Sequence, residues 1–321
     1  MQDELTIIIP TYNRRARLSR TLDCLERQTD QRFNLMIIDN ASEYNVNTIL
    51  EYRSSDFLKR VKLIRNKTNI GFCGNLSNVF LWPTTKWLWT VADDDIIMVD
   101  AVETINNQIS NNKEVAVFHF SLYDTSHIVD SHLHIESLKA YIEFYNKLLN
   151  DPLSHENTKG DIIFLSGYVY NTEKINEYLH YAFDYSYTYV PFLNIILKML
   201  DDKKDIFSFV NKKLIEYDNP DGDGWSGEKV LLGMRVLDDI QFNSITEKEK
   251  KNLLNIIIIK YKIALSMLSR ENHPNKILKR VYKDVYQEFL RPSQKLYYKS
   301  IMFLLKNPNL FKIVNKLRKK L

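Results

Sequence analysis

The chain has 321 residues, of which 45% are apolar and 26% charged, so it can bury a sizeable core and falls outside the disordered and low-complexity classes. Its two cysteines, Cys24 and Cys73, indicate neither a disulfide framework nor a thiolate zinc site, and they fit a reducing cytosol. The net charge of +4 is concentrated at one end, because residues 291–321 contain nine Lys/Arg and no Asp/Glu. The rest is mildly acidic, which argues against nucleic acid as the main partner.

The first 120 residues alternate between strand-like and helix-like patterns. A helix is expected after the first strand, where leucines recur at helical spacing and Asn13 is the predicted N-cap, and others at 75–82 and 99–110. This alternation predicts a doubly wound, mostly parallel α/β sheet. The apolar runs with the length of buried parallel strands span residues 5–9, 35–38, 61–64, 87–91 and 115–120.

The remaining residues are less regular and then become helical. Within 121–245, which is rich in Tyr, Phe and His, we expect a strand at 161–170 and a helix at 191–200. Thr246 and Glu249 match a capping box at the start of a long helix, and helical patterns continue to the end. The N-terminus does not resemble a signal peptide, and no stretch reaches the ~20 apolar residues of a membrane span. We therefore predict no transmembrane helix.

Polar residues follow the ends of four predicted strands. They occupy residues 10–13, 39–42, 66–71 and 93–95. In an open parallel sheet, ligands bind at the carboxyl ends of the strands, because loops and helix N-termini converge there. Each group alone could be a simple turn, but together they predict a ligand-binding crevice at this edge.

Three consecutive carboxylates, Asp93, Asp94 and Asp95, follow the fourth run. They repel one another, a cost that a divalent cation offsets, and oxygen ligands without nearby cysteine favour Mg²⁺ or Mn²⁺. The chain has neither a P-loop nor a dinucleotide-binding glycine motif to hold phosphates. The pattern therefore favours a metal that holds a substrate diphosphate, and the alternative is a solvated turn that caps the next helix.

Together these segments resemble glycosyltransferase family 2, the inverting nucleotide-sugar transferases with a GT-A fold. The resemblance covers about residues 4–120. It implies a GT-A-like sheet with an acceptor-side elaboration, and the helical C-terminal residues form an extension. The segments that carry the resemblance are Leu5 to Arg14 (LTIIIPTYNR), Ile37 to Ser42 (IIDNAS), Asn69 to Phe72 (NIGF) and Ala92 to Asp95 (ADDD).

The resemblance also implies roles for individual residues. Thr11 and Tyr12 would line the nucleobase pocket, and Asp39 would hydrogen-bond the base. Asp93 would face the ribose or the donor sugar, and Asp95 would bind the Mn²⁺ or Mg²⁺ that bridges the diphosphate. The other residues implied to contact the nucleotide are Pro10, Asn13, Asn69, Gly71 and Asp94.

An inverting transfer also needs a carboxylate base near the acceptor hydroxyl. Family members often carry it after a Phe-Asp-Glu-like turn, which Phe183-Asp184 resembles, but residues 187–189 contain no carboxylate. We predict Asp184 as the base and keep His180 as the alternative. Asp184 could equally be an ordinary loop carboxylate.

Weaker candidates lie in the second half. His127, His132 and His134 are expected to be solvent-exposed rather than metal ligands, because no carboxylate or thiolate completes a site. The segment 166–168 lies where an acceptor-side strand would pass, and ordinary strand packing explains it equally well. Trp225, in a glycine-rich loop, could cover the donor.

The resemblance predicts a metal-dependent inverting transferase with a UDP-sugar donor and a glycan or lipid-linked acceptor, acting in bacterial surface polysaccharide biosynthesis. We assign residues 1–120 to the donor half, 121–245 to the acceptor-binding and catalytic half of the same domain, and 246–321 to a basic helical extension. The alternatives are a sugar-phosphate nucleotidyltransferase and a catalytically inactive membrane-docking scaffold.

The basic C-terminal residues suggest a location. Lysines there are interleaved with apolar residues, a pattern typical of helices that dock on an anionic membrane. A basic helix that packs on its own domain would show the same periodicity. We expect a cytoplasmic protein at the inner face of the cell membrane.

Overall fold

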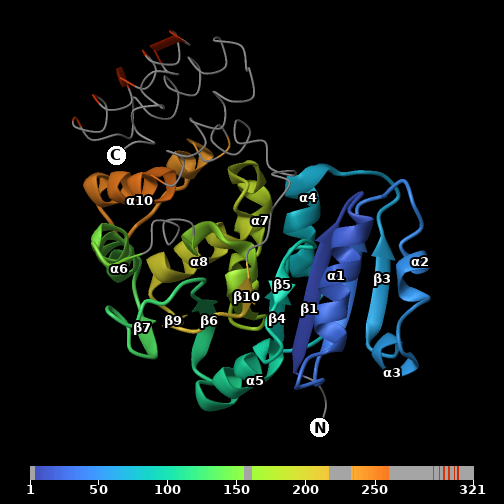
Figure 1. Cartoon of the computed structure of the whole chain (residues 1–321). Coiled ribbons are helices and arrows are strands. Elements are labelled where there is room, and N and C mark those ends of the chain that lie inside the picture. Colours follow the sequence, from blue (N-terminus) through green and yellow to red (C-terminus); the bar gives the residue numbers. More distant parts are fainter. Residues whose placement is uncertain are drawn as a thin grey trace.

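The computed structural model of the chain describes residues 4–154, 161–216, 233, 235–259 and scattered positions between 292 and 310. Its centre is an eight-stranded sheet with the order β3-β2-β1-β4-β8-β6-β9-β7 (Figure 1). The first four of these strands in space run parallel, while β8 pairs antiparallel with both β4 and β6. The strands are β1 (Leu5–Thr11), β2 (Asn34–Asp39), β3 (Val61–Arg65), β4 (Trp87–Thr90), β6 (Val115–Phe120), β7 (His132–Ile135), β8 (Tyr168–Asn171) and β9 (Ile206–Val210).

Helices cover both faces of this sheet, and each face has its own hydrophobic cluster. The strands alternate between the clusters with the period of two that a pleated strand imposes, so Ile7 and Ile9 of β1 point to one face and Ile8 to the other. On the first face lie α1 (Arg15–Glu26), α2 (Asn47–Leu50), α3 (Ser55–Leu58) and α5 (Ala101–Asn111). On the second lie α4 (Gly71–Asn78), α6 (Leu138–Asn150), α7 (His180–Asp184), α8 (Pro191–Asp202) and α10 (Glu247–Ile259).

The sheet joins the two halves that the sequence divides near residue 120. Strands β8, β9 and β7 from the second half lie beside β4 and β6 from the first. A two-stranded ribbon adds a further link, because β10 (Ile215–Glu216) pairs antiparallel with β5 (Ile96–Ile97) directly after the acidic segment. The doubly wound, mostly parallel sheet that the sequence predicts is confirmed.

Several predicted elements are confirmed and one is largely wrong. The helix over 191–200 is α8, and the capping box before α10 forms, with the Thr246 backbone N–H 2.8 Å from Glu249 Oε2. The strand expected over 161–170 is reduced to β8, because residues 161–163 are 3₁₀-helical and Leu165–Gly167 form a second short 3₁₀ helix, η3. These short helical turns bury Asp161, which accepts a hydrogen bond from Ser121 Oγ at 2.8 Å.

In the part of the chain that is described, no helix combines the length and the apolar character needed to cross a membrane. The glycine-rich loop with Trp225 and most of the basic C-terminal segment lie outside the described residues.

Candidate functional site

The strand register aligns three of the polar residues at the carboxyl edge of the sheet. Thr11 of β1 lies opposite Asp39 of β2, which in turn lies opposite Arg65 of β3. The Asp39 carboxylate is completely buried, and it accepts hydrogen bonds from the Arg65 guanidinium and, at 2.9 Å, from the Ser42 backbone N–H. Arg65 also donates to the Ser42 carbonyl at 2.6 Å. These contacts fix Asp39 and the loop after β2 in one position.

The loop after β1 is tied to the same place. Asn13 has a left-handed backbone (φ 55°); its N–H donates to Ser42 Oγ at 2.9 Å, and its side-chain oxygen accepts from the Glu43 N–H at 2.8 Å. The prediction that Asn13 caps α1 is therefore wrong, because its side chain bonds the neighbouring loop rather than the helix; the residue at the cap position is Arg14. Pro10 is partly buried and Tyr12 is exposed at this edge.

The acidic segment lies beside these loops because β1 and β4 pair in parallel. Asp93 accepts a hydrogen bond from Thr11 Oγ1 at 2.7 Å and lies 3.4 Å from the Arg14 guanidinium. Asp94 forms ion pairs with Arg14 at 2.6 Å and Arg17 at 3.3 Å. Arg20 adds a hydrogen bond to the Asp94 carbonyl at 2.9 Å. The first turns of α1 therefore neutralise part of the charge of the segment.

Asp95 is held from the second half of the chain. Its carboxylate is 2% exposed and accepts a short hydrogen bond from the Ser166 hydroxyl. That hydroxyl in turn accepts from the Ala92 backbone N–H at 2.8 Å, and the Ser166 carbonyl accepts from the Trp89 indole at 2.9 Å. Ser166 is therefore a fixed donor that orients the carboxylate of Asp95.

Burial makes ionisation of the two inner carboxyls costly. Burial raises the pKa of Asp93 to about 6, although the Arg14 guanidinium opposes the shift. Burial raises the pKa of Asp95 to about 8, opposed by the hydrogen bond from Ser166 and reinforced by the charges of Asp94 and Asp93. A cation bound beside these groups would favour their charged forms and would displace their protons.

The residues present fit a hard divalent cation. Mg²⁺ and Mn²⁺ prefer carboxylate oxygens, and Mg²⁺ is commonly held by one or two carboxylates together with phosphate oxygens of the substrate. Asp95 supplies such oxygens, and Asp93 lies two positions before it. Within the described residues there is no cluster of three or more His, Cys, Asp or Glu that could hold a metal by itself.

An asparagine network shapes the loop between β3 and α4. Asn40 donates to Asn69 Oδ1 at 2.9 Å and accepts from Asn66 Nδ2 at 3.0 Å, while Asn66 also donates to Asn75 Oδ1 at 3.0 Å. The Gly71 N–H donates to Asn69 Oδ1 at 2.8 Å, and its φ of 80° is a value that favours glycine. The network holds Asn69 and Gly71 beside the loop that follows Asp39.

The predicted base comes from another element, helix α7. Asp184 is the last residue of α7 and is exposed, and His180 at the start of the same helix is also exposed and packs on Tyr181, with ring centroids 4.0 Å apart. Among the hydrogen bonds and ion pairs of the described residues, neither side chain reaches the acidic segment. The edge of the sheet therefore gathers the predicted nucleotide and metal residues but not the predicted base.

The weaker candidates have different outcomes. His132 and His134 are exposed on β7, with ring centroids 5.2 Å apart. The segment 166–168 joins the cluster, because its Ser166 donates a hydrogen bond to Asp95.

Sequence reasoning missed several residues of the site. Arg14, Arg17 and Arg20 follow the first strand at intervals of three, a spacing that places them along one side of a helix. An arginine-bearing helix face after β1 and three carboxylates after β4 together indicate ion pairs between the two segments. Ser166 and Arg65 carried no such signal, because only the tertiary structure brings them to Asp95 and Asp39.

Comparison with known proteins agrees with this geometry. The model of the family described as "Glycosyl transferase family 2" matches residues 6–177. An uncharacterized glycosyltransferase of Haemophilus influenzae is 31% identical over 111 residues, which are 35% of this chain and 36% of that protein. The UDP-Glc:alpha-D-GlcNAc-diphosphoundecaprenol beta-1,3-glucosyltransferase WfgD of Escherichia coli is 25% identical over 154 residues, 47% of this chain and 57% of WfgD. The matched region thus spans about a third of the first relative and little more than half of WfgD.

Among solved structures, residues 1–349 of S. aureus TarS in complex with UDP-GlcNAc superpose with a TM-score of 0.57. The match covers 95% of this chain and 92% of that one, at 13% sequence identity. At this identity the likeness shows the fold alone, and it confirms the expected GT-A-type architecture.

The raised pKa values predict how the stability of the metal-free protein depends on pH. The folded state keeps protons on Asp93 and Asp95 that the unfolded state releases near pH 3.8, so we expect stability to fall as pH rises from about 4 to about 8. Between pH 6 and 8 the effect comes from Asp95, so Asp95→Asn should flatten the decline in this window. Thermal denaturation in chelator-treated buffer measures it, and an unchanged slope in the variant would contradict the assignment.

Proposed function

The chain belongs to glycosyl transferase family 2, and from this premise we propose that it is an inverting, metal-dependent enzyme that uses a UDP-sugar donor. Family membership makes it a glycosyltransferase rather than a nucleotidyltransferase. The observation that carries the proposal is the meeting of buried Asp93 and Asp95 with Thr11 and Asp39 at one edge of the sheet. We assign residues 1–120 to the donor and residues 121–245 to the acceptor.

The nucleotide is proposed to bind along this edge. Asp39 is buried and fixed by Arg65 and Ser42, and we propose that its carboxylate and the exposed Tyr12 contact the nucleobase. The asparagine network holds Asn69 and Gly71 beside the loop after Asp39, and we propose that they also contact the nucleotide. A site built on strand ends and braced loops is rigid, which favours discrimination of one base over another.

The diphosphate is proposed to meet Asp93 to Asp95. A metal held there by Asp95 would neutralise charge on the departing nucleoside diphosphate, and Asp93 would face the ribose or the donor sugar. Arg14 holds Asp93 and Asp94 by ion pairs, so it keeps the segment in place and supplies positive charge beside the leaving group. Ser166 orients Asp95 through the hydrogen bond described above.

The acceptor is proposed to approach from the second half of the chain. Asp184 is exposed at the end of α7 and would accept the proton of the attacking hydroxyl as it adds to the anomeric carbon. His180 on the same helix is the alternative base. We propose a glycan or lipid-linked acceptor in bacterial surface polysaccharide biosynthesis; the relative WfgD carries in its name a diphosphoundecaprenol-linked acceptor.

We expect Asp95→Ala to abolish metal-dependent binding of UDP, because the diphosphate charge is left without its cation. Isothermal titration of UDP with and without Mn²⁺ measures this loss. Asp100→Ala is the matched control, because Asp100 lies five positions further on and pairs with Lys212 at 3.2 Å. If Asp95→Ala binds UDP and Mn²⁺ like the parent, the metal assignment is wrong.

Asp184→Asn should leave UDP affinity unchanged and lower kcat by about 10² to 10⁴, since the amide keeps the shape but cannot accept the proton. Steady-state rates of sugar transfer measure this, with Glu177→Gln as a control for an exposed carboxylate that pairs with Lys204. A kcat within a few-fold of the parent would exclude Asp184 and direct attention to His180.

Peripheral membrane contact through the basic C-terminal residues remains a proposal, and it would bring a lipid-linked acceptor to the enzyme. Each basic residue near an anionic surface contributes about 1 kcal/mol at low salt. We expect the full-length chain to sediment with anionic liposomes and to be released as salt rises. Equal recovery with anionic and neutral liposomes would rule this contact out.

A further inference from the structure

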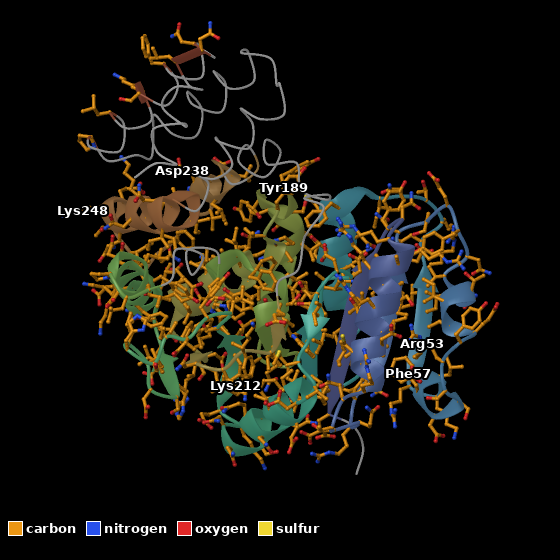
Figure 2. The ribbon with its side chains drawn as sticks, in the orientation of Figure 1. Arg53, Phe57, Tyr189, Lys212, Asp238 and Lys248 are labelled. Atoms are coloured by element: carbon orange, nitrogen blue, oxygen red, sulfur yellow. The ribbon has the colours of Figure 1, made fainter. Side chains whose placement is uncertain are left out.

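Two aromatic rings stack on each other beside the nucleotide loop. Phe72 is the second residue of α4, and Tyr189 follows the short helix η5 (Ser186–Thr188) in the second half of the chain. Their ring centroids lie 5.8 Å apart with an interplanar angle of 18°. Phe72 nevertheless remains 50% exposed. Figure 2 shows Tyr189 at the end of α7 that lies beside α4.

The backbone at Tyr189 is held in a conformation that bulky residues rarely adopt. Its φ of 64° lies in the left-handed region, and such strain persists only where the surroundings impose it. Here Gly233 packs so closely that a Cβ atom at that position would lie 2.2 Å from the Tyr187 carbonyl oxygen and 2.6 Å from Cδ2 of Tyr189. The Tyr189 N–H also donates to the Ser186 carbonyl at 3.2 Å. The fold therefore fixes this ring at an energetic cost.

The ring pair connects the two parts of the proposed reaction. Phe72 adjoins Gly71, whose N–H is bonded to Asn69 in the loop assigned to the nucleotide. Tyr189 is joined to Asp184, the proposed base, by one short turn. Helix α4 is also attached to α7 by the hydrogen bond from Ser77 Oγ to the Ala182 carbonyl at 2.7 Å. The ring pair thus joins the loop proposed for the nucleotide to the turn that follows the proposed base.

The exposed surface has the size and chemistry for a sugar ring. Protein interfaces bury about 800 Å² on each partner, far more than two aromatic rings present. A flat, half-exposed aromatic ring instead suits the apolar face of a pyranose, while polar groups at its rim bind hydroxyls. Tyr187, in the same turn, is 73% exposed.

We propose that Phe72 and Tyr189 form an acceptor subsite that stacks on a pyranose ring of the glycan acceptor. This inference rests on the proposed function, because that function supplies the acceptor. The strained turn at Tyr189 then serves to hold the ring parallel to Phe72, so that the acceptor hydroxyl is presented to the donor from the side of Asp184.

The test is saturation-transfer NMR of the methyl glycoside of N-acetylglucosamine, with and without UDP and Mn²⁺. We expect transfer to its ring protons in the parent, and about five-fold weaker binding in Phe72→Leu and Tyr189→Leu, the scale of an aromatic contact. Tyr189→Phe keeps the stack and should bind like the parent. Tyr52→Leu removes a tyrosine that is 86% exposed elsewhere and should have no effect.

Titrations with UDP separate the acceptor-subsite proposal from the proposal that the donor is a UDP-sugar. UDP affinity should stay within about two-fold of the parent in Phe72→Leu, whose thermal midpoint serves as a folding check. No glycoside binding to the parent, or equal binding to all variants, overturns the subsite whether or not UDP binds. Phe72-dependent glycoside binding without UDP affinity supports the subsite and removes the donor proposal. A matching loss of UDP affinity in Phe72→Leu assigns the rings to the nucleobase instead and also overturns the acceptor subsite.

Discussion

The burial of the carboxylates that follow β4 is the constraint on which the rest of the site depends. Asp93 and Asp95 are 6% and 2% exposed, and a buried carboxyl without partners would cost several kcal/mol. Their partners come from three separate parts of the chain, namely β1, the start of α1 and the turn that contains Ser166. The hydrogen bonds and ion pairs to Asp93 and Asp95 therefore hold helix α1 and the second half of the chain against the end of β4.

The remaining polar residues of the edge support this arrangement from the loops. The buried Asp39 and the asparagine network fix the exits of β2 and β3, so backbone groups that would otherwise be exposed in turns are bonded to side chains. Tyr12 and Phe72 lie at these braced loops and stay 39% and 50% exposed, so part of each ring faces solvent. Small-molecule sites commonly combine loops held rigidly by hydrogen bonds with partly exposed aromatic side chains that contact the ligand.

The places where sequence patterns failed are those where a tertiary contact replaced a local one. Asn13 has the composition of a helix cap, but its side chain bonds the loop after β2 instead. Residues 161–170 have the apolar content of a strand, yet Asp161 is drawn into the interior by Ser121 and Leu122, and the chain turns before it reaches β8. Both outcomes follow from bonds to residues distant in sequence, which no local pattern contains.

The sequence by itself determined the five strands β1, β2, β3, β4 and β6, because continuous apolar runs favour burial, and it determined which polar groups share one edge, because parallel strands end together. It also identified the family through motifs around Thr11, Asp39 and Asp95. Only the tertiary structure decided that Ser166 orients Asp95 from 71 positions away and that Phe72 stacks on Tyr189. These contacts form because the two halves of the chain pack together through β8. The distance in space between residues so far apart in sequence cannot be read from their spacing along the chain.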